Sequence, residues 1–231
     1  MSNEEAVLSS IGMRIYQEIQ RPDRKIVESF RDLPTSVIAD NMNRLYCMNA
    51  KIKPMNQASL IGTAFTVKTR PGDNLLVHKA IDLAKDGDIL VVDAQGDLTN
   101  AIIGELMVLW AKKKGLGGFI IDGAIRDSDS IATINFPVYA AGISPNGPYK
   151  DGPGEINVPV VCGGLVVRPG DIIVGDSDGV VVIQPQDAPD LLTQAKNKLA
   201  AEKQTMKEIE DLNWNRDWID SELGKKNTTI Y

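Results

Sequence analysis

Histidine, cysteine and aromatic residues are scarce in this chain. Its 231 residues include one histidine, two cysteines and 5% aromatic residues. A zinc site built from several imidazoles is therefore excluded within one chain, and a Ser-His-Asp triad would have to use His78, which has no nucleophile-elbow sequence around it. Cys47 and Cys162 are expected to be reduced thiols, because two cysteines without an export signal are poor evidence for a disulfide.

Long apolar runs and an excess of basic residues are also missing. No run approaches the roughly 20 apolar residues of a membrane-spanning helix, and residues 1–5 are acidic where a secretory signal would be basic. A cytoplasmic protein without a membrane partner is expected. The net charge of −6 and the pI near 4.9 argue against a nucleic-acid partner, which normally requires a basic face. The Lys112–Lys114 run is interpreted as the C-terminal end of a helix, where positive charges interact favourably with the helix dipole.

The hydrophobic content of 43% is sufficient for one sizeable core. Apolar periodicity predicts helices alternating with short strands, which is typical of a layered α/β domain. The helices are expected at residues 3–20, 24–30, 35–44, 74–84, 102–114 and 186–211. The strands are expected at residues 59–69, 87–93, 118–121, 138–140, 158–167, 170–176 and 179–183, with a surface loop at 144–154.

These elements predict a core with an additional segment at each end. The core is assigned to residues 46–185, the N-terminal helical segment to 1–45, and a C-terminal helix and tail to 186–231. The tail is polar and contains Trp214 and Trp218. An arm of this kind on a compact core often packs on a neighbouring subunit, so a homo-oligomer is expected.

The stretch from Gly104 to Asp127 carries the most chemical information. Glu105 stands at the start of a predicted helix, and the Arg126-Asp127 pair follows a predicted strand and a turn at Asp122-Gly123. Open α/β sheets bind ligands at the carboxyl ends of their strands. Carboxylates and a guanidinium at that edge suit Mg²⁺ or Mn²⁺ and a small 2-oxo acid, with Asp127 as the metal ligand. In the alternative interpretation, Asp127 caps a helical turn that begins at Ser128.

Arg126 and the start of the helix are candidates for binding the substrate. A guanidinium can polarise a ketone and stabilise an enolate oxygen, although the local sequence alone favours a structural salt bridge. A helix N-terminus presents unpaired amides and a partial positive charge to a carboxylate. The candidate residues for this contact are Gly104, Leu106, Met107, Val108 and Leu109.

The spacing between Glu105 and the Arg126-Asp127 pair, with Gly115 and Gly117-Gly118 between them, resembles the signature of the RraA-like family. The similarity extends over about residues 21–202. It includes Arg70-Pro71-Gly72-Asp73-Asn74, His78, Phe136-Pro137-Val138, Asn157-Val158-Pro159-Val160-Val161-Cys162, Pro169-Gly170-Asp171 and Asp176-Ser177-Asp178-Gly179-Val180-Val181. The resemblance implies a swivelling β/β/α-type sandwich that assembles as a trimer or a dimer of trimers.

Catalytic members of this family are 4-hydroxy-4-methyl-2-oxoglutarate aldolases that also decarboxylate oxaloacetate. The resemblance implies a lyase that forms pyruvate from either substrate class, through an enolate held by a divalent metal at Asp127 and by Arg126. It implies that Glu105 organises a water for proton transfer, at a position where characterised aldolases carry Asp. It also implies that Glu202 is a glutamate contributed to the site by an adjacent subunit.

Two alternative functions follow from the same resemblance. Some members are non-catalytic protein regulators that inhibit ribonuclease activity. Other relatives have carried a label of S-adenosylmethionine-dependent demethylmenaquinone methyltransferase. The methyltransferase is disfavoured because Gly115-Leu116-Gly117-Gly118 follows a predicted helix and opens a strand, whereas a nucleotide-binding glycine loop follows a strand and opens a helix. The acid, the arginine and the aspartate together favour the enzyme.

Overall fold

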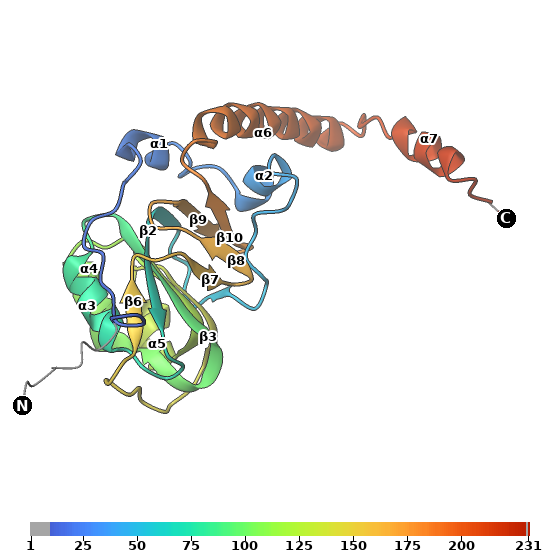
Figure 1. The fold of residues 1–231 in the computed structure, drawn as a ribbon. Helices are drawn as coiled ribbons and strands as arrows, with labels where there is room; N and C mark the ends of the chain where they lie inside the picture. Colours follow the sequence, from blue (N-terminus) through green and yellow to red (C-terminus); the bar gives the residue numbers. More distant parts are fainter. Residues whose placement is uncertain (1–9, 230) are drawn as a thin grey trace, which may run out of the picture.

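One eight-stranded sheet organises the computed structural model, which describes residues 10–229 and residue 231 (Figure 1). Its strand order is β1-β5-β4-β3-β2-β9-β10, with β6 paired to β2, and β7 and β8 form a separate hairpin. The strands are β1 (Lys53–Pro54), β2 (Leu60–Thr69), β3 (Asp88–Ile103), β4 (Gly118–Ile125), β5 (Val138–Ile143), β6 (Gly154–Ile156), β7 (Val160–Cys162), β8 (Leu165–Val167), β9 (Ile172–Asp176) and β10 (Gly179–Ile183).

The central strands β2, β3, β4 and β5 run parallel to one another. Parallel neighbours need a crossover connection, and here each crossover contains a helix. The helices are α1 (Arg24–Glu28), α2 (Thr35–Asp40), α3 (Leu75–Leu83), α4 (Glu105–Lys113), α5 (Ser128–Thr133), α6 (Ala188–Glu210) and α7 (Asp217–Lys225). Because α3, α4 and α5 follow β2, β3 and β4, the carboxyl ends of the parallel strands lie together at one edge of the sheet.

The sheet is covered on both faces, which explains the continuous apolar runs in its central strands. On one face, side chains of α3, α4 and α5 pack against Phe65, Leu90 and Phe119. Side chains of α1, α2 and α6 pack against the antiparallel strands β9 and β10. On the other face, the β7–β8 hairpin covers Val91 and Ile120. The order of hairpin, sheet and helices confirms the predicted layered α/β fold.

Most of the predicted elements are present, but the part of the first helix that falls on described residues is not. Its residues 3–9 lie outside the described part of the chain, and residues 10–20 form no helix. They form an extended segment in which Ile15 bridges Ile156 of β6, with Tyr16 N donating to Ile156 O over 3.2 Å. The helical pattern failed because Gly12 has a left-handed φ of 86° and the edge of β6 offers backbone partners.

The elements around the Arg126-Asp127 pair differ from the prediction in their bounds. Residues 102 and 103 belong to β3, so α4 begins at Glu105 and not at Ile102. The predicted turn at Asp122-Gly123 is wrong, since both residues lie inside β4 and are buried. Asp122 is stabilised there because its carboxylate accepts a hydrogen bond from Gly163 N and pairs with Lys51. The alternation of apolar residues predicted that the strand ends before Asp122, because it carries no information about the distant partners of a buried aspartate.

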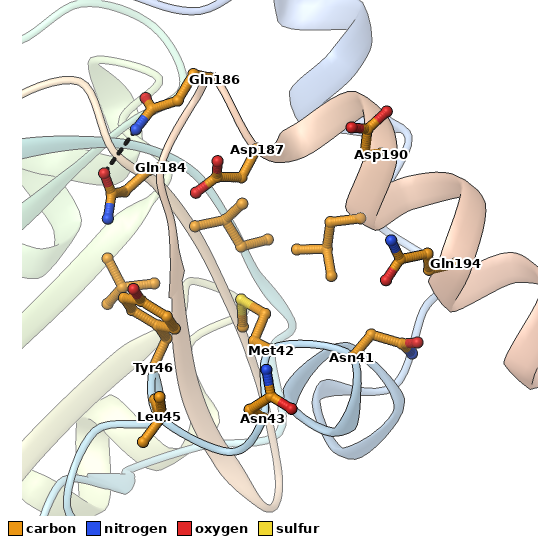
Figure 2. A pocket seen from close by; sticks show the side chains of 13 residues that line it. Asn41, Met42, Asn43, Leu45, Tyr46, Gln184, Gln186, Asp187, Asp190 and Gln194 are labelled. Atoms are coloured by element: carbon orange, nitrogen blue, oxygen red, sulfur yellow. Dashed lines mark hydrogen bonds between the residues drawn. The ribbon is translucent and has the colours of Figure 1, made fainter.

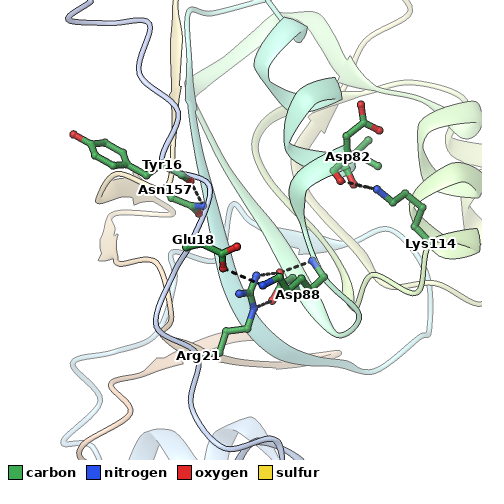
Figure 3. A network of polar contacts seen from close by, with 9 residues as sticks. Tyr16, Glu18, Arg21, Asp82, Asp88, Lys114 and Asn157 are labelled. Carbon is green, nitrogen blue, oxygen red and sulfur yellow. Dashed lines mark hydrogen bonds and ion pairs between the residues drawn. The ribbon is translucent and has the colours of Figure 1, made fainter.

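The lysine run, the two cysteines and the helices were also the subject of predictions. Lys112 and Lys113 lie in the last turn of α4, as predicted, and Lys114 is its C-cap residue. The Lys114 side chain donates hydrogen bonds to the carbonyls of Ile81 and Asp82 at the end of α3 (Figure 3). Both cysteines are unpaired, as predicted, with Cys47 exposed and Cys162 buried. None of the helices formed by the described residues combines the length and the apolar character needed to cross a bilayer.

Asp73 connects the start of α3 to the loop that follows β5. Its side chain is completely buried and accepts hydrogen bonds from Leu75 N, Asp151 N and Gly152 N at 2.9, 2.7 and 3.0 Å. These three amides come from two segments that are far apart in the sequence. The carboxylate therefore holds the loop around residue 150 against α3.

We expect Asp73→Ala to lower the free energy of unfolding by about 3 kcal/mol, because it leaves buried amides without an acceptor. Urea denaturation measures this change. Asp151→Ala is the control, since its exposed carboxylate lies 4.0 Å from Arg70 and adds little in water. Equal stability of the two variants would contradict the role given to Asp73.

Candidate active site

Two adjoining cavities lie at the carboxyl edge of the parallel strands, and both are lined by Arg126 and Asp127. The first cavity, of about 250 Å³, is bounded by α3, the end of β3, the start of α4 and the loop around residue 150. The second, of about 430 Å³, is bounded by Glu105, α5 and the end of β5. The Arg126-Asp127 pair thus forms the boundary between two recesses in the surface.

Asp127 is held in an unusual backbone conformation. Its φ of 58° lies in the left-handed region, which aspartate tolerates better than most other non-glycine residues. Its Oδ2 accepts a hydrogen bond from Glu105 N at 3.0 Å. Asp127 occupies the N-cap position of α5, which begins at Ser128 as the alternative interpretation predicted, but its side chain makes no capping hydrogen bond to that helix. The carboxylate instead caps α4.

Gly104 allows this contact. A Cβ atom at this position would lie 2.4 Å from Asp127 Oδ2 and 3.1 Å from Arg126 Nε. Any larger residue would therefore displace the carboxylate or the guanidinium. The backbone completes the junction, because Arg126 N donates to Ile103 O over 3.0 Å.

Arg126 keeps most of its hydrogen-bonding capacity. Its Nε lies 3.8 Å from Asp127 Oδ2, which is a loose ion pair, and the two side chains are 45% and 42% exposed. A Cβ on Gly147 would lie 3.2 Å from Arg126 Nη1, so the loop after β5 passes close to the guanidinium. A partly exposed arginine with one distant carboxylate is available to bind an anionic ligand.

The first turn of α4 has fewer available amides than the sequence suggested. Met107 N and Val108 N both donate to Gly104 O, at 3.1 and 3.2 Å, and Glu105 N is taken by Asp127. Leu106 N has no acceptor among the described residues. The prediction of a carboxylate contact is therefore most consistent with Leu106. Leu109 follows the first turn, where amides bond within the helix.

The two predicted glutamates occupy different parts of the chain. Glu105 lines the second cavity, and its side chain has no hydrogen bond or ion pair among the described residues. Glu202 lies on α6, across the molecule from α4 and α5, where it pairs with Lys198 at 3.5 Å (Figure 1). Within one chain Glu202 does not join Arg126, and its predicted role depends on an adjacent subunit.

Asn74 was not among the predicted site residues. It is 2% exposed and lines the first cavity, and its Nδ2 donates to Ile102 O at 2.8 Å. Its Oδ1 is buried without a hydrogen-bond partner. A buried acceptor without a partner is costly, and here it borders a cavity that a ligand or water can occupy. The sequence indicated Asn74 only as the last residue of the Arg70–Asn74 segment that resembles the family, and no local pattern assigned it to the site.

His78 and Lys150 add an imidazole and an ammonium group to the lining of the first cavity. The pKa of His78 is lowered by partial burial and by the positive charge of Lys150, while Asp82 opposes the shift. The imidazole is therefore more readily neutral than a free histidine. The sequence indicated His78 only through the family resemblance, and the loop that contains Lys150 could not be placed without the fold.

The donor set at Asp127 fits a hard divalent cation. Asp127 Oδ1 has no hydrogen-bond partner among the described residues, and one carboxylate with several waters is a usual protein contribution to Mg²⁺. The described side chains contain no group of three or more histidine, cysteine or acidic residues arranged to hold a metal. These residues thus form no closed metal cage, and the prediction of a metal ion at Asp127 requires a site in which one carboxylate and several waters bind the ion.

The fold and the cavities define a layered α/β protein with an open site at the strand ends, lined by both basic and acidic side chains. A family model described as Aldolase/RraA matches residues 35–182, which is more than half of the chain. A protein of Halalkalibacterium halodurans named "Putative 4-hydroxy-4-methyl-2-oxoglutarate aldolase" is 42% identical over 186 residues, covering 80% of this chain and 89% of that protein. The chain belongs to the RraA-like family.

Solved structures support the same fold. A protein of Pseudomonas syringae pv. tomato superposes with a TM-score of 0.75 at 24% identity, covering 84% of this chain and 96% of that one. RraAS2 of Streptomyces coelicolor, described as an unusual member of the RNase ES inhibitor RraA protein family, superposes with a TM-score of 0.73 at 25% identity, covering 80% and 98%. The family therefore includes proteins named for two different functions.

We expect Lys150→Met to raise the pKa of His78, because it removes a positive charge that disfavours the imidazolium. Asp82→Asn should lower the pKa further, since Asp82 acts in the opposite direction. His78 is the only histidine of the chain, so NMR titration of its ring protons reports the pKa directly. An unchanged midpoint in Lys150→Met would show that the two groups do not interact.

Proposed function

We propose that this protein is a carbon-carbon lyase that forms pyruvate from a 4-hydroxy-2-oxo diacid, such as 4-hydroxy-4-methyl-2-oxoglutarate, or from oxaloacetate. The observation that carries the proposal is the junction of Gly104, Arg126 and Asp127 between two cavities. It places a largely unpaired guanidinium beside a carboxylate with one unused oxygen. The name of the H. halodurans relative supports the same class of reaction.

Substrate binding follows from the charges at the site. Arg126 binds the 2-oxo acid head, and Leu106 N supplies an unpaired amide at the start of α4. Lys150 provides a second cation in the lining of the first cavity, which suits the second carboxylate of a diacid. Asn74 Oδ1 accepts a hydrogen bond from a substrate hydroxyl or a bound water.

Bond cleavage moves electrons onto the C2 oxygen of the substrate, which Arg126 binds. In the retro-aldol direction a base removes the proton of the C4 hydroxyl, the C3–C4 bond breaks, and its electron pair forms the C2–C3 double bond with negative charge on the C2 oxygen. Loss of CO₂ from oxaloacetate leaves the same enolate. Arg126 stabilises that oxygen as its charge develops, and protonation at C3 yields pyruvate.

Glu105 is suited to the proton transfers. Its carboxylate faces the second cavity beside Arg126 and has no competing partner among the described residues. It can act through one water, which accommodates a side chain one methylene longer than aspartate. Asp127 would hold Mg²⁺ or Mn²⁺, which supplies Lewis-acid polarisation of the keto oxygen when bound.

Two other functions agree less well with the site than the enzyme does. A regulator of ribonuclease activity is the second candidate, because RraAS2 shares the fold and is described in those terms. A regulator has no need for a buried unpaired amide oxygen or an unpaired glutamate at a cavity. A methyltransferase is disfavoured because the Gly115–Gly118 segment follows α4 and opens β4, the reverse of a nucleotide-binding loop.

We expect Arg126→Ala and Asp127→Asn each to lower kcat/KM for oxaloacetate and for 4-hydroxy-4-methyl-2-oxoglutarate by about 100-fold or more. A coupled pyruvate assay with added Mg²⁺ measures the rates, and excess EDTA should abolish the wild-type activity. Asp127→Asn is chosen because asparagine also tolerates the left-handed backbone.

Asp129→Asn is the matched control for this experiment. It removes one carboxylate from the rim of the second cavity, two residues from Asp127, without touching the junction. It should keep nearly full activity. A wild-type protein that turns over neither substrate with either metal would overturn the proposal and favour the regulator.

The role of Glu105 is tested by its charge and its length. We expect Glu105→Gln to lower kcat by about 100-fold with little change in KM, because it removes a proton carrier and not a binding group. Glu105→Asp should retain most of the activity. If the glutamine variant were fully active, proton transfer would have to be assigned to another group.

A further inference from the structure

The end of the C-terminal arm is not covered by any other described part of its own chain. Helix α6 has 23 residues, but its buried side chains are Ala188, Leu191 and Ala195, all within its first three turns. The second helix of the arm, α7, has no buried residue. The arm extends away from the body of the molecule (Figure 1). Helices are usually stabilised by side-chain contacts with other elements, but the α6 side chains that pack on the core end at Leu199, and α7 buries no side chain among the described residues.

The arm nevertheless carries large apolar side chains. Met206, Ile209, Leu212, Trp214 and Trp218 are between 42% and 96% exposed. Arg216 lies over the ring of Trp214, with its guanidinium carbon 5.2 Å from the ring centroid, and it forms no ion pair among the described residues. The pair presents an aromatic face and a positive charge together.

A groove of complementary character lies at the base of the same arm. It has a volume of about 330 Å³ and is formed by the loop after α2, the end of β10 and the first turns of α6 (Figure 2). Its apolar part includes Leu45 and Tyr46, which are 68% and 40% exposed. Its polar part includes Asp187 and Asp190, and neither carboxylate has an ion pair or a side-chain hydrogen bond among the described residues.

We propose that the Trp214–Arg216 pair of one copy docks in this groove of a second copy. The indole covers the apolar part of the groove, and the guanidinium faces Asp187 and Asp190. Such a contact buries aromatic surface and pairs charges that are otherwise unpaired on both sides.

The arm cannot reach the groove of its own chain. Helix α6 begins at the groove and leads away from it without a break, and its 23 residues span roughly 34 Å. A second copy is the occupant that the chemistry favours, because every copy carries both the groove and the arm. Exchange of arms in this way also closes an assembly without leaving either surface exposed.

The contact can be tested by disulfide cross-linking between two co-expressed forms of the full chain with different tags. Both forms carry Cys47→Ser, which removes the exposed thiol, while Cys162 stays buried. One form carries Leu45→Cys in the groove and the other carries Asn215→Cys between Trp214 and Arg216. Mild oxidation should then join the two tags in one covalent product.

Lys203→Cys is the matched control, because it places a thiol at an exposed position of the same arm that is remote from the Trp214–Arg216 pair. It should give no product with Leu45→Cys. Circular dichroism checks that each form is folded. Equal cross-linking from Lys203→Cys, or none from Asn215→Cys, would overturn the proposal, as would a wild-type protein that sediments as a monomer.

A charge exchange identifies the pairing directly. Arg216→Glu on the arm, or Asp187→Lys in the groove, should each reduce the cross-linked product by about tenfold or more. Combining the two substitutions should restore it. Lys207→Glu, which reverses an exposed charge on α6, should have no effect. Failure of the combined exchange to restore the product would contradict the proposed pairing of Arg216 with the groove, and so would a loss with Lys207→Glu.

Discussion

The parallel pairing of β3 with β4 is the constraint on which the candidate site depends. It brings the ends of the two strands together, so that Arg126 N bonds to Ile103 O and Asp127 Oδ2 bonds to Glu105 N. These two contacts lock the start of α4 to the residues that follow β4. The close approach requires glycine at position 104, because a side chain there would occupy the space of the carboxylate.

The remainder of the site is formed by the loop around residue 150 and the segment after β5, which lie at the same edge of the sheet. Asp73 ties the loop around residue 150 to α3, which places Lys150 opposite His78. The irregular second half of β3 holds the segment after β5, where Asn100 Nδ2 donates to Gly147 O at 2.6 Å. Both loops are anchored by buried or partly buried side chains, so the protein framework fixes the backbone from which Lys150 reaches the cavity.

Groups without partners occur in two separate places, at the strand ends and on the C-terminal arm. The site at the strand ends has an unpaired amide oxygen and a loosely paired guanidinium, which point to a small anionic ligand. The C-terminal arm has exposed indoles and a stacked arginine, which point to a protein surface. The two sets lie at different ends of the sheet, because α6 covers the antiparallel strands while α4 and α5 cover the parallel ones.

The amino-acid sequence by itself determined the alternation of strands and helices and the family, because these depend on local periodicity and short spacing. It also indicated Glu105, Arg126 and Asp127 as candidate site residues. It misplaced the N-terminal segment and the turn at Asp122, since backbone pairing with β6 and the partners of a buried carboxylate come from distant residues. Only the tertiary structure decided that Asp127 caps α4, that Asn74 has an unpaired oxygen in a cavity, and that the arm is uncovered. Each of these facts depends on how segments far apart in the sequence pack together, and such contacts leave no pattern in the local sequence.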